Sequence, residues 1–354
     1  MKICILSMQS IVNYGSVLQA YALRRLLQNL GHEVDFIDIQ GDGDSIPEID
    51  YSNDNMRCNF MYLYHRLTNH LQRKKIKEFQ IDVLELNETN NLKEYDVCVI
   101  GSDEVFNCNQ KSSWGFSMQL FGKVTNAKKV ITYAASCGQT SFEQLTDDKK
   151  EKIKCALRNL NAISVRDKNT MDLVNAFGYR QCNYSLDPTL IYDFSKDLSI
   201  SSTSKGKYNN ICLIYAYQDR ISDPREIYYI KEFCKKKGLR IVAAGAYQSW
   251  LKEQLYLKPF ELLEAFSQAD FVITDTFHGA IFSIKYTERF AILVRDGNRN
   301  KLQDLVERLG VKNHLAQDIR DLDKIYGLKK ETDTIESVIA MEKEKSYKYL
   351  KEQI

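Results

Sequence analysis

A histidine that follows an apolar strand near the end of the chain has the type and position needed for acid–base chemistry. Residues 271–273 are apolar and run directly into a polar turn, 274–279, that contains His278 where a helical segment begins. Ligands of open α/β sheets gather outside the carboxyl ends of the strands, and helix N-termini favour anions. We therefore expect His278 to hold a phosphate group and to donate a proton to it. The alternative is a helix-start residue hydrogen-bonded to a neighbouring carbonyl.

The turn between the first expected strand and the first expected helix is a second candidate. It contains Asn13, Tyr14, Gly15 and Ser16. Gly15 can adopt unusual dihedral angles and its backbone can approach a ligand closely, while Ser16 suits the N-cap of the helix. The turn lacks the G-x-G-x-x-G spacing of a dinucleotide site, so a plain strand-to-helix turn is the alternative.

A carboxylate follows another apolar strand, at residues 96–100. Gly101 and Ser102 lead into Asp103 and Glu104. Small residues followed by an acid at the carboxyl end of a strand suit a group that orients or deprotonates a sugar hydroxyl. A helix N-cap formed by Ser102 or Asp103 is the alternative.

Two more strand ends carry polar groups. Ser136 lies in a small-residue turn after an expected strand, and Arg166 ends the strand 162–165. An arginine that emerges from an apolar strand can bind a carboxylate or a phosphate with two hydrogen bonds. A salt bridge from Arg166 to Asp167 or Asp187 is the alternative.

Alternating strands and helices must position these turns. Short apolar runs alternate with helical segments over most of the chain, which predicts mostly parallel, doubly wound sheets. The expected strands are residues 2–7, 33–39, 95–100, 129–134, 162–165, 211–215, 239–244, 270–274 and 290–294. The expected helices are residues 16–30, 146–160, 169–177, 224–237, 259–267, 279–286 and 301–309.

A polar stretch rich in serine, lysine and asparagine separates the two series of strands. Residues 196–210 are the best linker candidate, so we expect a first α/β domain at 1–195 and a second at 211–325. Residues 326–354 contain a charged segment of helical periodicity. We expect this segment to pack across another surface, such as that of the first domain.

The composition excludes several classes of function. The chain has 354 residues, which suits two domains, and its 49 basic and 47 acidic residues leave no overall field for nucleic acid. The N-terminal residues have neither the pattern of a signal peptide nor that of a transmembrane helix, which predicts a cytoplasmic protein. Nine scattered cysteines without a C-x-x-C pair indicate reduced thiols, and we expect neither a disulfide nor a metal site.

Seven blocks, in order along most of the chain, resemble the polysaccharide pyruvyltransferase family. They are residues 13–23, 101–103, 133–136, 165–166, 187–189, 275–279 and 298–299. The resemblance implies two Rossmann-like doubly wound domains in a GT-B-like arrangement, with the active site in the cleft between them. It also implies the reaction, in which phosphoenolpyruvate transfers its pyruvyl group to two hydroxyls of one sugar, a cyclic ketal forms and phosphate is released.

The resemblance further implies a role for each candidate residue. His278 is the phosphate ligand or acid at the donor, Arg166 binds an anionic group of phosphoenolpyruvate, and Asp103 acts on the acceptor hydroxyl. The second domain binds the donor, also through Thr276, Phe277 and Gly279. The first domain lines the acceptor with Asn13, Tyr14, Gly15, Ser16, Ser102, Glu104 and Ser136. Phosphoenolpyruvate is a co-substrate in this scheme, and no cofactor is needed.

The chain departs from the family's pattern at the donor motif. Thr276 stands where some members have an arginine, so one phosphate-binding charge is missing. Because a buried anion is costly unless it is paired, another cation must reach the donor. The strand 290–294 ends at a second turn on the same face, and we expect Arg299, or else Arg295, to supply the charge. Surface solvation with a salt bridge to Asp296 is the alternative.

A basic segment, residues 57–77, is a candidate for contact with a membrane. It has six Arg or Lys and no acid, and its apolar residues recur at helical spacing. Such a helix suits anionic lipid headgroups, and therefore an acceptor linked to a polyprenyl diphosphate at the inner face of the membrane. The alternative is a helix with one face buried against the first domain.

Two other functions fit the same architecture. A glycosyltransferase that uses a nucleotide sugar would have the same two-domain fold, because the fold alone does not determine the donor. A non-catalytic sugar-phosphate-binding protein is the third interpretation, which the threonine at position 276 makes reasonable. Protection from heat by phosphoenolpyruvate, but by no nucleotide, would favour the pyruvyltransferase.

Overall fold

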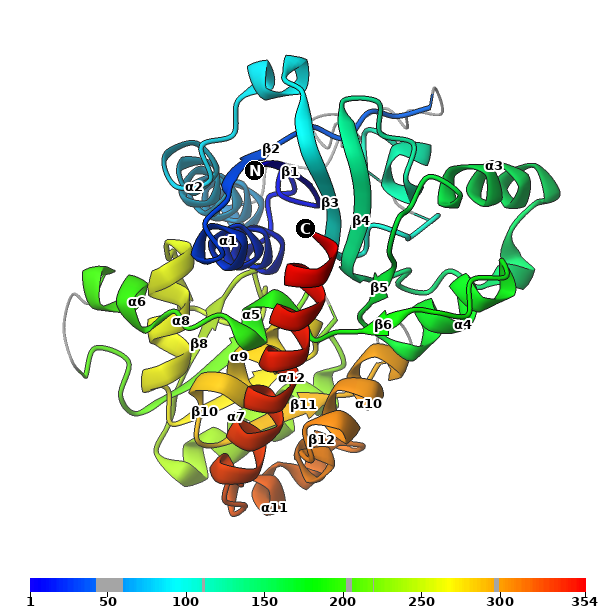
Figure 1. Ribbon diagram of the computed structural model, residues 1–354. Helices are drawn as coiled ribbons and strands as arrows, with labels where there is room; N and C mark the ends of the chain where they lie inside the picture. The colour runs from blue at the N-terminus through cyan, green and yellow to red at the C-terminus, as the bar shows by residue number, and fades with distance from the viewer. Residues whose placement is uncertain (43–59, 110–111, 202–205, 219, 296–298) are drawn as a thin grey trace.

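Each half of the molecule is built on one parallel six-stranded sheet (Figure 1). The computed structural model describes residues 1–42, 60–109, 112–201, 206–218, 220–295 and 299–354. We call the described residues up to 201 the first half and those from 206 the second half. The strand pairs of both sheets are parallel, and the prediction of two doubly wound α/β units is confirmed.

The first sheet has the strand order β2-β1-β3-β4-β5-β6. Its central strands are short apolar runs and are buried, as expected for a parallel sheet with helices on both faces. β3 extends to Asp103, so Ser102 and Asp103 belong to a strand. The alternative, in which one of them caps a helix, is wrong. The strands are β1 (Lys2–Leu6), β2 (Glu33–Phe36), β3 (Tyr95–Asp103), β4 (Ala127–Ala135), β5 (Ser164–Val165) and β6 (Asn183–Tyr184).

The second sheet has the strand order β12-β11-β10-β7-β8-β9. Counted along the chain, this order matches that of dinucleotide-binding folds, whereas the order of the first sheet is of the flavodoxin type. The strands are β7 (Ile211–Tyr215), β8 (Arg240–Ala244), β9 (Gln254–Leu255), β10 (Phe271–Thr274), β11 (Phe290–Leu293) and β12 (Leu315–Ala316). The two-residue strands β9 and β12 are too short to show a periodic pattern, and the sequence does not predict them.

Helices cover the two faces of each sheet. In Figure 1, α1 and α2 lie on one side of the first sheet, and α3 and α4 lie on the other. The helices are α1 (Tyr14–Asn29), α2 (Phe60–Asp82), α3 (Asp147–Leu157), α4 (Lys168–Ala176), α5 (Pro188–Ile191), α6 (Ser195–Ser201), α7 (Pro224–Lys237), α8 (Pro259–Gln268), α9 (Phe277–Tyr286), α10 (Arg299–Arg308), α11 (Leu322–Tyr326) and α12 (Thr332–Gln353).

Apolar side chains join the two halves. Tyr21 of α1 meets Phe260 of α8 edge to face, with the ring centroids 5.2 Å apart. The hydroxyl of Tyr14 donates to the carbonyl of Leu257 at 2.5 Å. One buried apolar cluster contains side chains from both sheets. The halves therefore pack through a continuous core, which holds their facing edges in a defined position.

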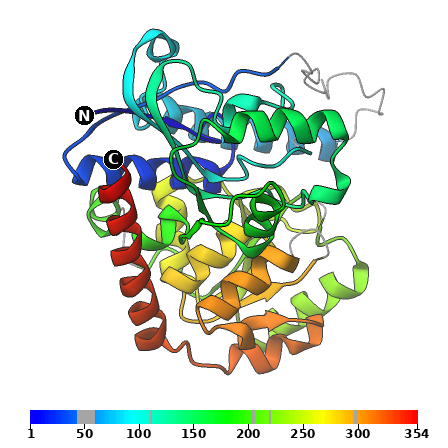
Figure 2. The same cartoon turned by 45° about the vertical axis from the view of Figure 1, so that its right-hand side comes forward.

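The C-terminal helix α12 extends from the second half to the first, as Figures 1 and 2 both show. The hydroxyl of Tyr349 donates to the carbonyl of Thr132 at 2.8 Å, which ties the end of the helix to β4. Glu342 pairs with Arg308 of α10. Part of the stretch expected to be a linker is helical, because α6 covers Ser195–Ser201; residues 202–205 lie outside the described residues.

Helix α2 contains most of the basic segment. Its residues Ile76 and Phe79 are buried against the first half, whereas Leu71 is exposed. The apolar side chains expected nearer its start, those of residues 60–67, lie outside the described residues, as does Arg57. Within the described ranges, no helix is long and apolar enough to cross a membrane.

Candidate active site

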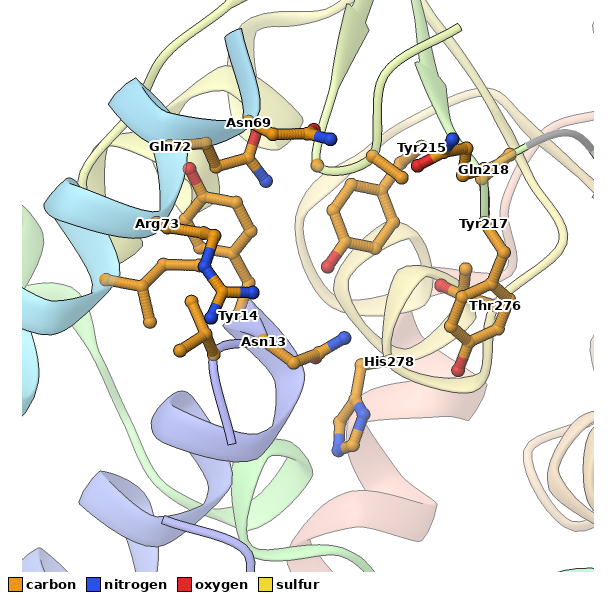
Figure 3. A pocket seen from close by; sticks show the side chains of 15 residues that line it. Asn13, Tyr14, Asn69, Gln72, Arg73, Tyr215, Tyr217, Gln218, Thr276 and His278 are labelled. Carbon is orange, nitrogen blue, oxygen red and sulfur yellow. The ribbon is translucent and has the colours of Figure 1, made fainter. Parts of the chain in front are cut away.

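A cavity of about 260 Å³ opens between the two halves (Figure 3). It lies where the strand order reverses, at the carboxyl ends of β1 in the first sheet and of β7 and β10 in the second. Open α/β sheets bind ligands at such reversal points. We call this space the interface cavity; it is lined by Val12, Asn13, Tyr14, Asn69, Gln72, Arg73, Ile76, Tyr215, Ala216, Tyr217, Gln218, Gly245, Ala246, Thr276 and His278.

Two walls from different halves enclose the interface cavity (Figure 3). On one side, α2 contributes Arg73 beside Gln72, and α1 contributes Tyr14. On the other side, Tyr215 ends β7 and Tyr217 follows it. Among the described residues that line the cavity, none is acidic and one is an arginine. The cavity therefore suits an anionic ligand.

The start of α1 differs from the prediction. Asn13 is the N-cap, because its Oδ1 accepts hydrogen bonds from the backbone N–H groups of Gly15 at 2.8 Å and of Ser16 at 3.4 Å. The hydroxyl of Ser16, expected to cap the helix, donates instead to Oδ2 of Asp103 at 3.0 Å. The cap residue must precede the first helical residue, and the helix begins two residues earlier than expected.

Gly15 is needed for close packing, since it lies inside the helix and not in a turn with unusual dihedral angles. A Cβ atom at this position would lie 2.2 Å from Nδ1 of His278. Such a separation is far shorter than any van der Waals contact. The hydrogen atom of Gly15 thus allows the N-terminus of α1 to meet the imidazole of α9 across the two halves.

His278 lies in the first turn of α9. Thr276 caps this helix, because its hydroxyl accepts a hydrogen bond from the N–H of Gly279 at 2.9 Å. The imidazole Nε2 lies 3.6 Å from Oδ2 of Asp187, and the side chain is 12% exposed. Nε2 is buried and makes no hydrogen bond to any described residue. The predicted position of His278 at a helix start is confirmed. The alternative is a hydrogen bond to a neighbouring carbonyl, and Nε2 makes none among the described residues.

Arg166 joins this histidine to the first half. Its Nη1 donates to Oδ2 of Asp187 at 2.7 Å, and its Nη2 lies 3.7 Å from Oδ1 of Asp103. The guanidinium lies 4.2 Å from the ring centroid of Phe277, so the aromatic ring supports the cation. The salt bridge to Asp187, which is the alternative considered for Arg166, is therefore present. Asp103, Arg166, Asp187 and His278 form a buried chain of charged and titratable groups.

The carboxyl group of Asp187 has a strongly lowered pKa. Burial disfavours its carboxylate, but the nearby imidazole of His278, the charge of Arg166 and the hydroxyl of Thr189 hold its pKa well below the usual range. The N–H and the hydroxyl of Thr189 donate to Oδ1 at 3.0 and 2.6 Å. Asp187 is therefore anionic at neutral pH, and the imidazole of His278 has a fixed negative neighbour that orients it.

Ser102 and Ser136 make buried hydrogen bonds next to this chain of charges. The hydroxyl of Ser102 donates to the carbonyl of Ala134 at 2.9 Å. The hydroxyl of Ser136 donates to Oδ2 of Asp167 at 2.6 Å. Both serines are fully buried and neither lines the interface cavity, so in this structure they connect neighbouring strand ends.

Glu104 and Lys301 form an ion pair between the two halves. Burial raises the pKa of Glu104, but the charge of Lys301 and a 2.7 Å hydrogen bond from Asn107 outweigh it and lower the pKa from its ordinary value. Like the two serines, Glu104 is not part of the cavity wall. The pair instead lies where α10 meets the turn after β3.

The two arginines expected to replace the missing charge lie elsewhere. Arg295 pairs with Glu226 of α7 at 2.7 Å. Arg299 is exposed at the first residue of α10. Neither lines the interface cavity, and Asp296 lies outside the described residues. The arginine in the cavity wall is Arg73.

The sequence alone does not predict Arg73 and Asp187 as site residues. Asp187 follows β6 and caps α5, so it occupies a strand exit like the other candidates, and this position is the signal that could have found it. Arg73 is one of several cations in a helical segment far from His278 in the chain. No local pattern distinguishes it from Lys74 or Lys75.

The two facing doubly wound sheets, with a cavity at their reversal points, define a protein of the GT-B-like class. The UDP-GlcNAc 2-epimerase of Methanocaldococcus jannaschii has a similar structure, with a TM-score of 0.50 and 11% identity over 96% of this chain and 99% of that protein. A Streptomyces sp. SF2575 glycosyltransferase matches 98% of this chain and 96% of its own at 13% identity, with a TM-score of 0.46. Against an O-GlcNAc transferase of Thermobaculum terrenum, 99% of this chain matches but spans 63% of that protein, at 10% identity and a TM-score of 0.43.

The chain belongs to the polysaccharide pyruvyl transferase family, because the sequence profile of that family matches residues 13–296. This match confirms the resemblance seen in the sequence blocks. It begins at Asn13 and includes Asp103, Arg166, Asp187 and His278. No curated protein matches the chain significantly. Family membership indicates a transferase that acts on a polysaccharide substrate.

Proposed function

We propose that the protein transfers the pyruvyl group of phosphoenolpyruvate to two hydroxyls of one sugar in a bacterial surface polysaccharide precursor. The observation that carries this proposal is the environment of His278. Its imidazole lies at a helix N-terminus, beside a cavity whose described lining has no acid. Asp187 lies 3.6 Å from Nε2 and orients the ring. A small anion that must receive a proton fits this environment.

The first chemical step is protonation. His278 gives a proton to C3 of the enol, which makes C2 electrophilic, and the first sugar hydroxyl adds to C2. The phosphate leaves, and the second hydroxyl adds to the same carbon and closes the ketal. Of the two hydroxyl protons, one restores the proton donated to C3 and the other leaves with hydrogen phosphate. General acid catalysis of this kind contributes about 10²- to 10⁴-fold.

Asp103 is the base for the acceptor hydroxyl in this proposal. Its Oδ2 accepts a hydrogen bond from the hydroxyl of Ser16 at 3.0 Å, so the carboxylate is already oriented toward a hydroxyl donor. Its other oxygen faces Arg166 at 3.7 Å, which keeps the negative charge compensated when no sugar is bound. The acceptor would approach from the first half, where Asp103 ends β3.

The size of the interface cavity favours phosphoenolpyruvate over a nucleotide sugar. Pockets for drug-sized ligands measure about 300–1,000 Å³, and this cavity measures about 260 Å³. A three-carbon phosphate is small enough for such a space, whereas a nucleotide sugar is itself of drug size. A nucleotide-sugar glycosyltransferase is therefore the second candidate and an outcome of the test below.

The proposal includes an acceptor linked to a polyprenyl diphosphate at the inner face of the cytoplasmic membrane. Its support is the charge of α2, where Lys74, Lys75 and Lys77 lie within four residues next to the cavity-lining Arg73. Sedimentation with vesicles of phosphatidylglycerol, compared with vesicles of phosphatidylcholine alone, tests this part separately. Equal sedimentation with both kinds of vesicle would contradict contact between α2 and anionic lipid, and would remove this support for a lipid-linked acceptor.

One incubation tests donor and acceptor together. The protein is mixed with phosphoenolpyruvate and a panel of α- and β-galactosides, glucosides and mannosamine derivatives, and both phosphate and product mass are measured. We expect phosphate release with an acceptor whose mass rises by one pyruvyl ketal. Heat protection by UDP or thymidine diphosphate, with none by phosphoenolpyruvate, would favour the glycosyltransferase instead.

A further inference from the structure

Three cations near the candidate site are already paired with carboxylates. Arg166 is buried between Asp187 and Asp103. Lys301 pairs with Glu104, and Arg295 pairs with Glu226. Releasing any of these cations to a ligand would leave a buried or half-buried carboxylate without its partner, which is strongly unfavourable. An anionic ligand therefore needs a cation that has no carboxylate to lose.

Arg73 meets this requirement. It lines the interface cavity from α2, and no carboxylate of the described residues pairs with it. Figure 3 shows its guanidinium directed into the space between Tyr14 and Asn13, on the side of the cavity opposite Thr276. The amides of Asn69 and Gln72 line the same wall and can donate further hydrogen bonds.

We propose that Arg73 binds the anionic end of the donor and supplies the charge that Thr276 cannot. The assignment rests on the proposed function, because it names the residue that holds phosphoenolpyruvate. A guanidinium presents two parallel N–H donors to a phosphate or a carboxylate, and this pairing is stronger than that of neutral groups. The hydroxyl of Thr276 accepts a hydrogen bond from the N–H of Gly279. Because this hydroxyl carries no charge, it cannot neutralise an anionic donor.

The consequence is that both halves hold the donor. Arg73 belongs to α2 of the first half, and His278 belongs to α9 of the second half. The donor would bridge these helices, so its binding would strengthen the association of the two walls. This proposal replaces the expectation that the second domain binds the donor while the first domain lines only the acceptor.

Calorimetric titration of the full chain with phosphoenolpyruvate tests the assignment without requiring the acceptor. Arg73→Ala is expected to weaken binding about ten- to a hundred-fold. Arg73→Lys is expected to recover part of the loss, because an ammonium keeps the charge without the paired donors. Lys74→Ala is the matched control, since Lys74 is the next residue of the same helix, is exposed and does not line the cavity.

The outcomes separate the assignment from the proposed function. If the parent protein binds phosphoenolpyruvate and Arg73→Ala binds it equally well, Arg73 is not the donor's cation. The same holds if Lys74→Ala weakens binding as much as Arg73→Ala, because the effect is then one of general charge. A folded parent protein that binds no phosphoenolpyruvate overturns the proposed function and this assignment with it. Thermal unfolding of each variant confirms that a loss of binding is not a loss of fold.

Discussion

The strand exits of the two halves meet at one site but use their side chains in opposite ways. In the first half, Asp103 ends β3 and Arg166 follows β5, and both are charged groups that are paired and largely buried. In the second half, the exits of β7 and β8 present Tyr217 and Gly245 to an open cavity. One half thus provides a fixed arrangement of charges, and the other provides most of the space. The comparison teaches that a polar residue at a strand exit is not necessarily a ligand contact.

The physical reason for this difference is the cost of burying charge. Arg166 is almost inaccessible, so it must be compensated in the absence of ligand, and Asp187 does this at 2.7 Å. A side chain engaged in this way can hold His278 in position, but it has little freedom to follow a substrate. The cavity wall can be formed by small and aromatic residues because these need no partner.

The largest expected effect comes from removing the imidazole that lies between the two regions. His278→Ala should lower turnover by about 10²- to 10⁴-fold, because it removes the proposed acid. Phosphate release with phosphoenolpyruvate and a reactive diol measures this. His32→Ala is the control, since His32 is partly exposed at the far end of α1. Near-normal turnover of folded His278→Ala protein would return His278 to a structural role.

The charged region of the first half should show the largest effect on stability. Asp187→Asn leaves Arg166 buried without its closest carboxylate, and the expected loss is about 3–5 kcal/mol of the free energy of unfolding. Urea unfolding measures the loss. Asp103→Asn should cost less, because its carboxylate lies 3.7 Å from Arg166 and is partly accessible. Equal losses for the two variants would contradict the assignment of Asp187 as the main partner.

The same variant predicts a pH dependence. The folded-state pKa of Asp187 is lowered, so the folded state binds its proton more weakly than the unfolded state, where the pKa is about 3.9. The stabilisation by this carboxylate is therefore fully present above that pH and is lost as the pH falls toward the folded-state pKa. The difference in unfolding free energy between the parent protein and Asp187→Asn should shrink in acid. A difference that stays constant between neutral pH and pH 3 would argue against this linkage.

Contact between the regions is tested at Gly15. Gly15→Ala puts a methyl group 2.2 Å from Nδ1 of His278, which must move the imidazole or separate the walls. Overpacking of this kind costs about 1–3 kcal/mol, and we expect turnover to fall with the unfolding free energy. Gly327→Ala is the control, because its Cβ would lie 3.4 Å from the nearest atom. If Gly15→Ala is as active and as stable as Gly327→Ala, the close packing is not required.

The smallest effect on donor binding is expected at Asp103. Asp103→Asn should impair acceptor use while leaving the affinity for phosphoenolpyruvate close to that of the parent protein, because Asp103 does not line the interface cavity. Calorimetry with phosphoenolpyruvate and acceptor-dependent phosphate release measure the two quantities separately. A loss of donor affinity as large as that of Arg73→Ala would place Asp103 on the donor side.

Much of the framework follows from local patterns in the sequence. The alternation of apolar runs and helical segments predicts both sheets, and the turn containing His278 is correctly predicted at the carboxyl end of a strand. The helix caps are less predictable, because several neighbouring residues have suitable side chains. Asn13 and Ser16 are both good caps, and the position of the first helical residue decides between them.

The amino-acid sequence by itself determined which strand ends carry polar chemistry, because strand and helix periodicity is local and the turns follow directly from it. Only the tertiary structure decided which groups meet. Arg166 could pair with Asp167 or Asp187, and packing of the strand ends selected Asp187. The approach of His278 to Gly15, and the position of Arg73 in the cavity wall, join residues about 200 or more positions apart. Such contacts depend on how the two halves pack, and no pattern within either segment encodes them.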